Sequence, residues 1–337
     1  MARVTLADVA AVVGVSAKSV SNVVNGTGWV SDEVRARILE AIKDLDYRPN
    51  LAARQLRGGS SGLLALGVPD LREPYFAEFA SQFVGAAQDR GVTVLIAQTG
   101  GQRAAELAFA EAEGLPALDG LVLSPLAITE EDLLGRRSRT PIVLVGEHGG
   151  SVVPAEMTHV GIDNVAAARA ATEYLISRGR TRIAAIGVQH EGSTATSRQR
   201  FAGFRQALAK AGLPLDETLL GTVGLFNRAE GSRAVDALIE RAASFDALMC
   251  FNDTLALGAL YSLGVHGVAV PDDVDVMGFD DIEEGRFSIP AFATVDPGVE
   301  ATAATILDLL AAPEALPGGH REVPFRLMRC EGVAATR

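Results

Sequence analysis

Cysteine is scarce in this sequence of 337 residues, and its scarcity excludes a disulfide-based fold. The two cysteines, Cys250 and Cys330, lie far apart and lack the CxxC spacing of zinc and redox motifs. A single pair cannot form the disulfide framework that holds small secreted domains together. We therefore expect a protein of a reducing compartment in which both side chains simply pack.

Long apolar runs are absent as well. The longest, such as residues 63–68, are far shorter than the roughly 20 residues that a membrane-spanning helix needs. The N-terminus shows no apolar stretch of the signal-peptide kind. The expected protein is cytoplasmic and has no membrane partner.

Basic residues are too few to balance the acidic ones, and their distribution is uneven. The net charge is −12 with histidine neutral, so the average surface would repel phosphate groups. Residues 1–57, however, carry 8 basic and 6 acidic side chains, whereas the remainder has a net charge of −14. Any DNA-binding surface must therefore lie near the N-terminus, where Lys18 is one of only three lysines in the chain.

Signatures of catalysis are missing. The sequence has no GxGxxG, GxxxxGK[ST] or HExxH motif, and its five histidines lack the spacing of metal ligands. His190 and Glu191, for example, lack the second histidine that a zinc site would need. We expect no catalytic residues, no metal and no cofactor, and hence no enzyme.

The chain is long enough for more than one folding unit. Residues 5–46 have the apolar spacing of three short helices, and the flexible sequence GGSSG follows at 58–62. We therefore expect an all-α headpiece at residues 1–48, a hinge helix and linker at 49–62, and a core at 63–337.

The core alternates short β-like runs with amphipathic stretches, which predicts parallel sheets covered by helices on both faces. The β-like runs are 63–68, 92–97, 120–123, 142–145, 183–187, 247–251 and 274–278. The helical stretches are 76–90, 165–178, 198–211, 228–242 and 254–263. We expect an N-subdomain of about 63–161 plus 293–322, a C-subdomain of about 162–292 plus 323–337, and a cleft between them.

The headpiece has the pattern of a helix-turn-helix. Thr5, Ser16 and Ser31 can cap three helices, Gly14 ends the first helix, and Pro49 stops the third. In this motif the second helix enters the major groove of DNA by its N-terminal end.

Polar side chains at that end suit the chemistry of a DNA groove. The side chains expected at base edges are Ala17, Lys18, Ser21 and Asn22. Those suited to phosphates, which orient the domain without selecting a sequence, are Thr5, Ser16 and Ser19. Lys18 can donate to guanine, and Asn22 can pair with adenine. The alternative is a generic three-helix bundle whose polar residues only face water.

Four segments carry a resemblance to a known family: VTLADVA at 4–10, GVS at 14–16, SVSNVVN at 19–25 and YRPN at 47–50. They closely resemble the N-terminal signature of the lactose repressor and galactose repressor (LacI/GalR) family of transcription regulators. The resemblance implies that the headpiece binds DNA as it does in the family, with its second helix in the major groove. It also adds Asn25 and Asn50 to the expected DNA-binding set. One departure is Asn22, where many relatives have arginine.

The segment NLAARQLR at 50–57 resembles the family's hinge helix, which forms on the operator and inserts a leucine into the minor groove. Leu56 matches that leucine, and Arg54 and Arg57 would contact phosphates. Unstacking a base step costs a few kcal/mol, and the resulting bend offsets this cost by bringing more phosphates within reach of the protein. The alternative is a solvated linker with one incidental leucine.

Later segments resemble the family's core, which is similar to a periplasmic sugar-binding protein. By matching position, Arg200, Asn252 and Asp280 would be polar contacts to a small-molecule effector. Asn252 and Asp280 each follow a predicted strand, where open α/β sheets bind ligands. The aromatic members of the expected effector-binding set are Tyr75, Phe76 and Phe226.

Several of these residues have a structural alternative. Asp280 could cap a turn, Asn252 could begin the next helix, and Phe226 could belong to the ordinary core. Two positions depart from relatives: Glu73 stands where asparagine is frequent, and Pro297 replaces a glutamine that some sugar-binding relatives use.

These features predict a sequence-specific DNA-binding regulator, most often a repressor in this family, that binds a palindromic operator as a homodimer. A small-molecule effector, a sugar or sugar derivative, would bind the cleft and change operator affinity. The alternative among regulators is a co-repressor that is a nucleobase or another metabolite. The alternative outside them is a binding protein or enzyme with a vestigial headpiece.

Overall fold

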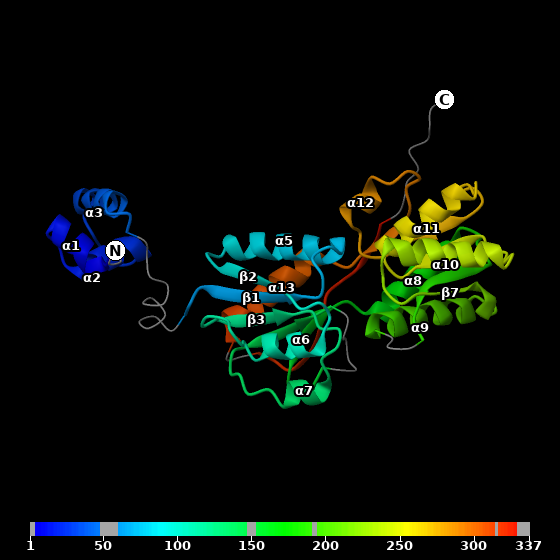
Figure 1. Cartoon of the computed structure of the whole chain (residues 1–337), viewed down its shortest axis with the longest axis horizontal. Coiled ribbons are helices and arrows are strands. Elements are labelled where there is room, and N and C mark those ends of the chain that lie inside the picture. The colour runs from blue at the N-terminus through cyan, green and yellow to red at the C-terminus, as the bar shows by residue number, and fades with distance from the viewer. Residues whose placement is uncertain (1–3, 48–59, 147–152, 191–193, 314–315, 329–337) are drawn as a thin grey trace, which may run out of the picture. The chain divides into compact units, whose positions relative to one another are not determined.

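The computed structural model describes residues 4–47, 60–146, 153–190, 194–313 and 316–328. The chain divides into two compact units between Ser61 and Gly62, and each unit is described by itself. The described residues of the first unit form three helices, and those of the second form two parallel sheets with their covering helices (Figure 1).

The first unit contains helices α1 (Leu6–Val13), α2 (Ala17–Asn25) and α3 (Asp32–Asp44). Thr5 and Asp8 form a capping box at the start of α1, because the Thr5 N–H donates to Asp8 Oδ2 at 2.8 Å and the Asp8 N–H donates to Thr5 Oγ1 at 3.4 Å. Gly14, with φ of 73°, ends this helix. Ser16 caps α2 by accepting from the Ser19 N–H at 3.1 Å.

Helix α3 ends earlier than the sequence predicts. It stops at Asp44, and the chain turns through Asp46, which has a φ of 44°. The Tyr47 N–H then donates to the Ile42 oxygen at 2.9 Å, and the Tyr47 side chain is buried. Pro49, the predicted stop of this helix, lies outside the described residues.

The headpiece core consists of small aliphatic side chains from all three helices. Its fully buried members include Val9, Val13, Val20, Val23 and Ile38. Other residues that the sequence pattern turns inward, Leu6, Val24, Val34, Ile42 and Leu45, are half-buried. Within the described residues no single helix is long and apolar enough to cross a membrane, and only the bent pair of α1 and α2 reaches that length and composition together.

The N-subdomain is built on a six-stranded parallel sheet. Its strands in spatial order are β11 (Gly319–Glu322), β5 (Thr158–Gly161), β4 (Ile142–Val145), β3 (Gly120–Leu123), β1 (Leu63–Val68) and β2 (Thr93–Gln98). Its helices are α5 (Pro74–Gln88), α6 (Arg103–Ala110), α7 (Glu130–Leu134) and α13 (Val299–Ala311). Helices α5 and α13 pack together on one face, and α6 and α7 lie on the other (Figure 1).

The C-subdomain is built on a four-stranded parallel sheet. Its strands in spatial order are β7 (Leu220–Thr222), β6 (Ile183–Val188), β8 (Ala247–Cys250) and β9 (Asp275–Met277). Its helices are α8 (Asn164–Ser177), α9 (Ala195–Lys210), α10 (Arg228–Glu240), α11 (Asp253–Val265) and α12 (Glu283–Arg286), with a 3₁₀ turn at Glu217–Leu219. Helices α8 and α9 pack on one face, and α10 and α11 pack on the other (Figure 1).

Glycine allows α10 and α11 to approach closely. A Cβ at Gly231 or at Gly258 would collide with a backbone oxygen of the facing helix. Both helices follow parallel strands, so their capped N-termini, at Asn227 and Asn252, lie at the carboxyl edge of the same sheet. This edge forms part of the site described below.

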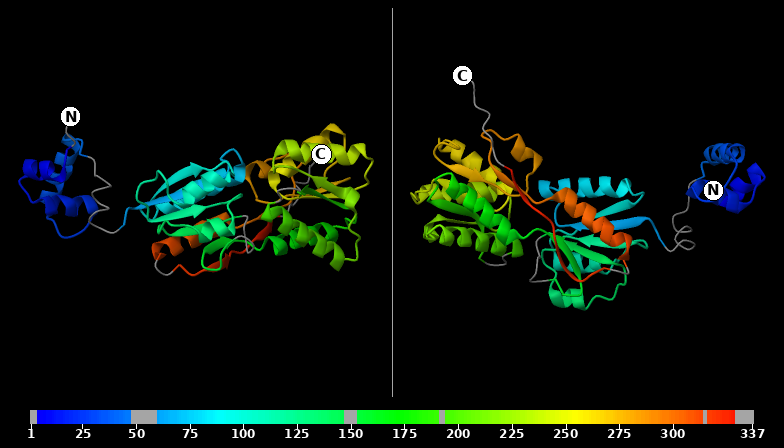
Figure 2. Two further views of the ribbon diagram at one scale, coloured as in Figure 1. Left: turned by 60° about the horizontal axis from the view of Figure 1, so that its bottom comes forward. Right: turned by 180° about the vertical axis from the view of Figure 1, so that it is seen from behind.

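One part of the core departs from the all-parallel arrangement that the sequence predicts. Strands β10 (Thr294–Asp296) and β12 (Arg326–Met328) pair antiparallel. Strand β10 leads into α13, and β12 follows β11, so this pair lies in segments that connect the two subdomains (Figure 2).

Candidate functional site

Helix α2 presents its first turn to solvent. Ala17 and Lys18 are exposed, whereas Ser21 and Asn22, one turn later, are half-buried. The Asn22 side chain lies against Gly28 of the following loop, where a Cβ would collide with the Asn22 amide. Of the four side chains expected at base edges, Ala17 and Lys18 are therefore the most accessible.

The hydroxyl groups expected at phosphates take part in helix caps. Thr5 Oγ1 donates to Asp8 Oδ2 at 2.7 Å, and Ser16 Oγ lies 2.9 Å from Ser19 Oγ. These contacts hold the hydroxyls at the N-termini of α1 and α2, where backbone N–H groups favour anions. The side chain of Asn25 and the whole of Asn50, Arg54, Leu56 and Arg57 lie outside the described part of the chain, so their roles stay predictions.

A cavity of about 990 Å³ lies in the core, lined by residues of both subdomains. Strand ends and the loops that follow them contribute its walls, as is usual for ligand sites of open α/β sheets. All six residues that the sequence predicts at an effector line this cavity: Tyr75, Phe76, Arg200, Phe226, Asn252 and Asp280. Their contact with an effector stays a prediction.

Arg200, on α9, is the central charged group of the C-subdomain wall. Its Nε donates to Asn164 Oδ1 at 3.0 Å, its Nη1 donates to the backbone oxygen of Phe251, and its Nη2 lies 3.5 Å from Asp280 Oδ1. The guanidinium also lies over the Phe279 ring, 3.4 Å from the ring centroid. These contacts fix the guanidinium in one orientation beside Asp280.

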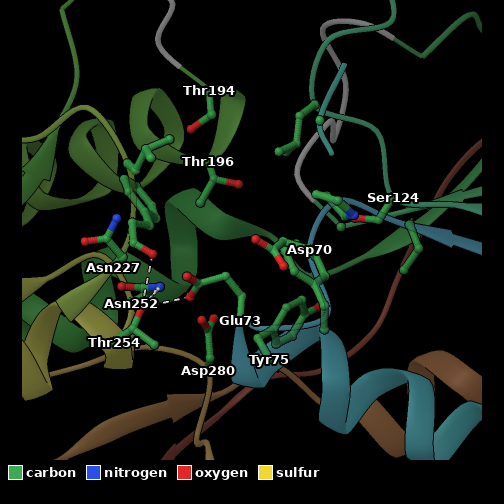
Figure 3. Close-up of a pocket in the computed structure, with 18 of the residues that line it drawn as sticks. Asp70, Glu73, Tyr75, Ser124, Thr194, Thr196, Asn227, Asn252, Thr254 and Asp280 are labelled. Carbon is green, nitrogen blue, oxygen red and sulfur yellow. Dashed lines mark hydrogen bonds between the residues drawn. The ribbon is translucent and has the colours of Figure 1, made fainter. Parts of the chain in front are cut away.

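Asp280 and its neighbour Asp281 have backbone conformations that favour glycine, with φ of 113° and 52°. Hydrogen bonds hold both: the Asp280 N–H donates to the Val295 oxygen at 2.8 Å, and Arg286 Nη2 donates to the Asp281 carboxylate at 2.7 Å. Backbone strain of this kind clusters at functional sites. The strained turn places Asp280 at the cavity wall (Figure 3).

Asn252 has a structural role in addition to its place in the cavity. Its Oδ1 accepts from the Leu255 N–H at 2.9 Å, so Asn252 caps α11. Its Nδ2 donates to Thr254 Oγ1 at 2.6 Å. The structural alternative for Asn252, the start of a helix, is therefore what the structure shows, and the same side chain lines the cavity.

Aromatic side chains supply an apolar part of the lining. Tyr75 contacts Phe76 edge to face, with ring centroids 5.2 Å apart, and stacks on Phe79 at 6.5 Å. Phe226 precedes α10 and packs half-buried against the core. Its backbone oxygen accepts from Thr254 Oγ1 at 3.2 Å.

Two hydroxyl groups in the cavity were missed by the sequence analysis. Ser124 Oγ and Thr196 Oγ1 are the buried side-chain polar atoms that lack a hydrogen-bond partner within the described residues. An unsatisfied buried polar group costs roughly 1–3 kcal/mol, which a ligand could recover. Figure 3 shows them on different walls, since Ser124 belongs to the N-subdomain and Thr196 to α9. Two sequence features could have indicated these residues. Ser124 directly follows a predicted strand, and Thr196 shares a helix face with Arg200.

Two carboxylates of the N-subdomain also line the cavity. Asp70 forms an ion pair with Arg72 at 2.7 Å, and hydrogen bonds from Arg72 lower the pKa of Asp70. Glu73 Oε2 lies 3.4 Å from Thr254 Oγ1 of the C-subdomain, and burial raises the pKa of Glu73. The pKa values of these two carboxyl groups are thus shifted in opposite directions.

Within the described ranges, no group of three or more histidine, cysteine, aspartate or glutamate side chains could hold a metal ion. Cys250 is buried in β8 as a free thiol, and Cys330 falls among the residues that the structure does not describe.

Comparison with known proteins identifies both units. Residues 5–50 match the family described as "Bacterial regulatory proteins, lacI family", and residues 172–331 match "Periplasmic binding protein-like domain". The HTH-type transcriptional regulator DegA of Bacillus subtilis is 31% identical over 298 residues, which are 87% of this chain and 86% of DegA.

Solved structures show the same architecture. The transcriptional regulator CelR in complex with cellobiose is 30% identical and has a TM-score of 0.67, over 98% of this chain and 100% of CelR. The Lac repressor dimer bound to operator and the anti-inducer ONPF has a TM-score of 0.84 over 97% of this chain and 98% of that one. At 22% identity, this second likeness shows the shared fold.

A helix-turn-helix headpiece followed by a two-sheet core with a ligand-sized cavity defines a DNA-binding transcription regulator. Because DegA is 31% identical over most of both chains, the protein belongs to the LacI family of bacterial regulators. The family, the fold class and the regulatory function predicted from the sequence are confirmed. The prediction that the protein is not an enzyme is confirmed too, because these relatives are transcription regulators.

Proposed function

We propose that this regulator binds a palindromic operator as a homodimer and that a sugar or sugar derivative in the core cavity controls its operator affinity. The observation that carries the choice of ligand is the set of polar groups that converge on the cavity from both subdomains, with the Ser124 and Thr196 hydroxyls still unpartnered among the described residues. A ligand with several hydroxyl groups would satisfy them. Because the target is the bacterial chromosome, the protein would act in the cytoplasm.

In this proposal helix α2 enters the major groove. Ala17, Lys18, Ser21 and Asn22 contact base edges, and Thr5, Ser16 and Ser19 contact phosphates. Asn25, Asn50, Arg54, Leu56 and Arg57 complete the DNA-binding set, the last four within the hinge at 49–62. The exposure of Lys18 in the first turn of α2 supports this orientation.

A sugar also suits the apolar part of the cavity. Tyr75 and Phe226 offer ring faces that can stack on the apolar face of a sugar ring. Arg200 and Asp280, which already contact each other, offer a forked donor and a two-oxygen acceptor to neighbouring hydroxyls. CelR, a relative at 30% identity, has been solved in complex with cellobiose.

Exposed apolar side chains on the C-subdomain support self-association. Tyr261 and Val265 of α11 are 69% and 66% exposed, and Phe287 and Ile289, which follow α12, are 78% and 98% exposed. Helices α11 and α12 lie on the same side of the core (Figure 1). Exposed apolar side chains on one side of a molecule are a feature of association surfaces. A two-fold dimer presents two copies of α2, and its operator is therefore palindromic.

The effector must bind the two states of the dimer unequally in order to act. We infer that it favours one orientation of the N-subdomain (63–161 plus 293–322) relative to the C-subdomain (162–292 plus 323–337) and so changes the hinge. Linkage then requires operator DNA to change effector affinity by the same factor.

Two measurements test the proposal. A thermal-shift screen of neutral sugars, sugar phosphates and purines should show stabilisation by a sugar. Fluorescence anisotropy with duplexes selected from a random pool should then show a change of operator affinity when that sugar is added. Stabilisation by purines alone would favour the nucleobase alternative. Absence of a salt-sensitive preference for any duplex would exclude operator binding.

The headpiece roles are tested with Lys18→Ala and Arg57→Ala. Lys18→Ala should reduce discrimination between operator sequences. Arg57→Ala should weaken binding to all duplexes evenly and lower the salt slope by about one unit. Equal effects of the two substitutions on discrimination would contradict this assignment.

A further inference from the structure

Glu73 places a carboxylate in the cavity that forms no ion pair with a described residue. It directly precedes Pro74, the first residue of α5, and it lines the cavity. Its side chain extends from the N-subdomain toward Asn252 and Thr254 of the C-subdomain (Figure 3). No ion pair joins it to a described basic side chain: Arg228 pairs with Glu284 and Arg72 pairs with Asp70, and both arginines attract the Glu73 charge only at longer range.

The other charged side chains of the cavity lining are paired. The pairs are Asp70 with Arg72 at 2.7 Å, Asp280 with Arg200 at 3.5 Å, and Arg228 with Glu284 at 2.8 Å. The described lining contains no lysine and no histidine. An anionic ligand would therefore have to compete with an existing carboxylate for each of these arginines, whereas Glu73 forms no ion pair.

Glu73 also has spare capacity to accept hydrogen bonds. Its described partner is Thr254 Oγ1, whose single proton is shared between Glu73 at 3.4 Å and the Phe226 oxygen at 3.2 Å. Asn252 Nδ2 donates to the same Thr254 oxygen. A carboxylate can accept about four hydrogen bonds, so most of this capacity faces the cavity unused. Burial raises the pKa of Glu73, because the loss of hydration outweighs the attraction of the Arg228 and Arg72 charges and the hydrogen bond from Thr254.

We propose that Glu73 sets the charge specificity of the cavity: it accepts hydrogen bonds from the hydroxyl groups of an uncharged effector and excludes phosphorylated and other anionic ligands. This inference rests on the proposed function, since it concerns the same effector cavity. It narrows the ligand from sugars and their derivatives to sugars without a negative charge.

The first test needs no ligand. Glu73→Gln removes a half-buried charge that lacks a cation, so the melting temperature of the full-length ligand-free protein at pH 8 should rise. The matched control is Glu106→Gln. Glu106 is also buried, but its carboxylate accepts from the backbone N–H groups of Leu126, Ala127 and Ile128 at 2.7 to 2.9 Å. Its substitution should lower the melting temperature, because an amide group would face these donors.

The second test compares ligands of different charge. Isothermal titration calorimetry should be run with glucose and glucose 6-phosphate, ribose and ribose 5-phosphate, and cellobiose and its 6′-phosphate. The neutral member of a binding pair should bind the wild-type protein at least about tenfold more tightly, since like charges brought together in a site disfavour binding strongly. In Glu73→Gln this ratio should fall toward one.

Three outcomes have distinct meanings. A lower melting temperature for Glu73→Gln would make Glu73 a structural link across the cleft and overturn the inference. Tighter binding of a phosphorylated member, or a ratio unchanged in Glu73→Gln, would overturn it as well. If no sugar of either charge binds, the proposed sugar effector fails, and the melting comparison alone decides the role of Glu73.

Discussion

Asp253 is a buried carboxylate next to the cavity, and its ionisation connects pH with the stability of the core. Its Oδ1 accepts from Thr294 Oγ1 at 2.6 Å, and its Oδ2 accepts from the Ile282 N–H at 3.0 Å. Burial nevertheless dominates and raises the pKa of Asp253 from 3.8 to about 7. The residue thus holds the first residue of β10 and the turn after Asp280 to the start of α11.

The raised pKa predicts the sign of a pH effect. Between about pH 4 and pH 7 the folded protein keeps a proton on Asp253 that the unfolded chain has lost. The free energy of unfolding therefore falls as the pH rises through this window. Asp253→Asn should reduce that fall, because an amide does not titrate. The asparagine side chain can donate to Thr294 Oγ1 and still accept from the Ile282 N–H. Urea denaturation at pH 5 and pH 8 measures it, and an equal pH dependence in both proteins would contradict the prediction.

The unpartnered hydroxyl of Thr196 predicts a separation between stability and binding. Thr196→Val should leave the melting temperature of the ligand-free protein unchanged or slightly raised, because no hydrogen bond to a described residue is lost. It should weaken binding of the sugar found in the thermal-shift screen by up to about tenfold, the effect of one hydrogen bond.

Thr172 provides the matched control for Thr196. It is also a buried helical threonine, but its Oγ1 donates to the Ala168 oxygen at 2.8 Å. Thr172→Val should therefore lower the melting temperature and leave sugar affinity unchanged. If both valine variants lose stability equally, the Thr196 hydroxyl has a partner in solution and is not reserved for a ligand.

At the scale of elements, continuous apolar runs made strands predictable. The bounds of β1, β3 and β4 agree with the runs at 63–68, 120–123 and 142–145, since these strands are buried along their whole length. The strands β5 and β11 were missed. Their sequences, THVG and GHRE, lack such a run, and they form a strand pair through contacts between residues about 160 positions apart. Local sequence does not record that pairing.

The candidate site also has residues that local sequence predicts and features that only tertiary packing decides. Asn252 and Asp280 could be predicted because they follow strands, and strand ends meet at one sheet edge. The missing hydrogen-bond partners of Ser124 and Thr196, and the lack of an ion pair at Glu73, depend on which of the described neighbours do not reach them. That is decided by tertiary packing, so the residue types alone could not reveal it.

The loop between α2 and α3 contains a tryptophan whose fluorescence can report DNA binding. Trp29 is the only tryptophan of the chain and is 88% exposed. It follows Gly28, which lies against Asn22 of α2. Binding of α2 in a major groove should bring the indole ring close to the DNA, so operator addition should quench and shift its emission.

A simple titration checks this. Emission is followed while the selected operator duplex is added, first at low salt and then at a salt concentration that abolishes binding. A response that persists at high salt, or no response while anisotropy shows binding, would place Trp29 away from the DNA. Trp29→Phe, which removes the signal, serves as the blank.

The whole molecule combines a basic headpiece with an acidic core, and this distribution of charge favours DNA binding by the headpiece alone. Residues 1–57 have a net charge of +2, and the remainder has a net charge of −14. The core surface therefore repels phosphate, and attraction to DNA is confined to the headpiece. One weakly charged headpiece gives little affinity by itself, so operator binding should depend on two headpieces held together.

Disruption of the proposed dimer surface tests that dependence. Ile289 is 98% exposed, and Ile289→Asp should shift the protein to monomers, as measured by sedimentation equilibrium. Operator affinity should fall by about 100-fold or more, because the second half-site is then no longer bound intramolecularly. The control is Leu134→Asp, which alters an apolar side chain on α7 that is 60% exposed and lies away from α11 and α12 (Figure 1). It should remain dimeric and bind normally. A monomeric Ile289→Asp that keeps full operator affinity would show that a single headpiece suffices.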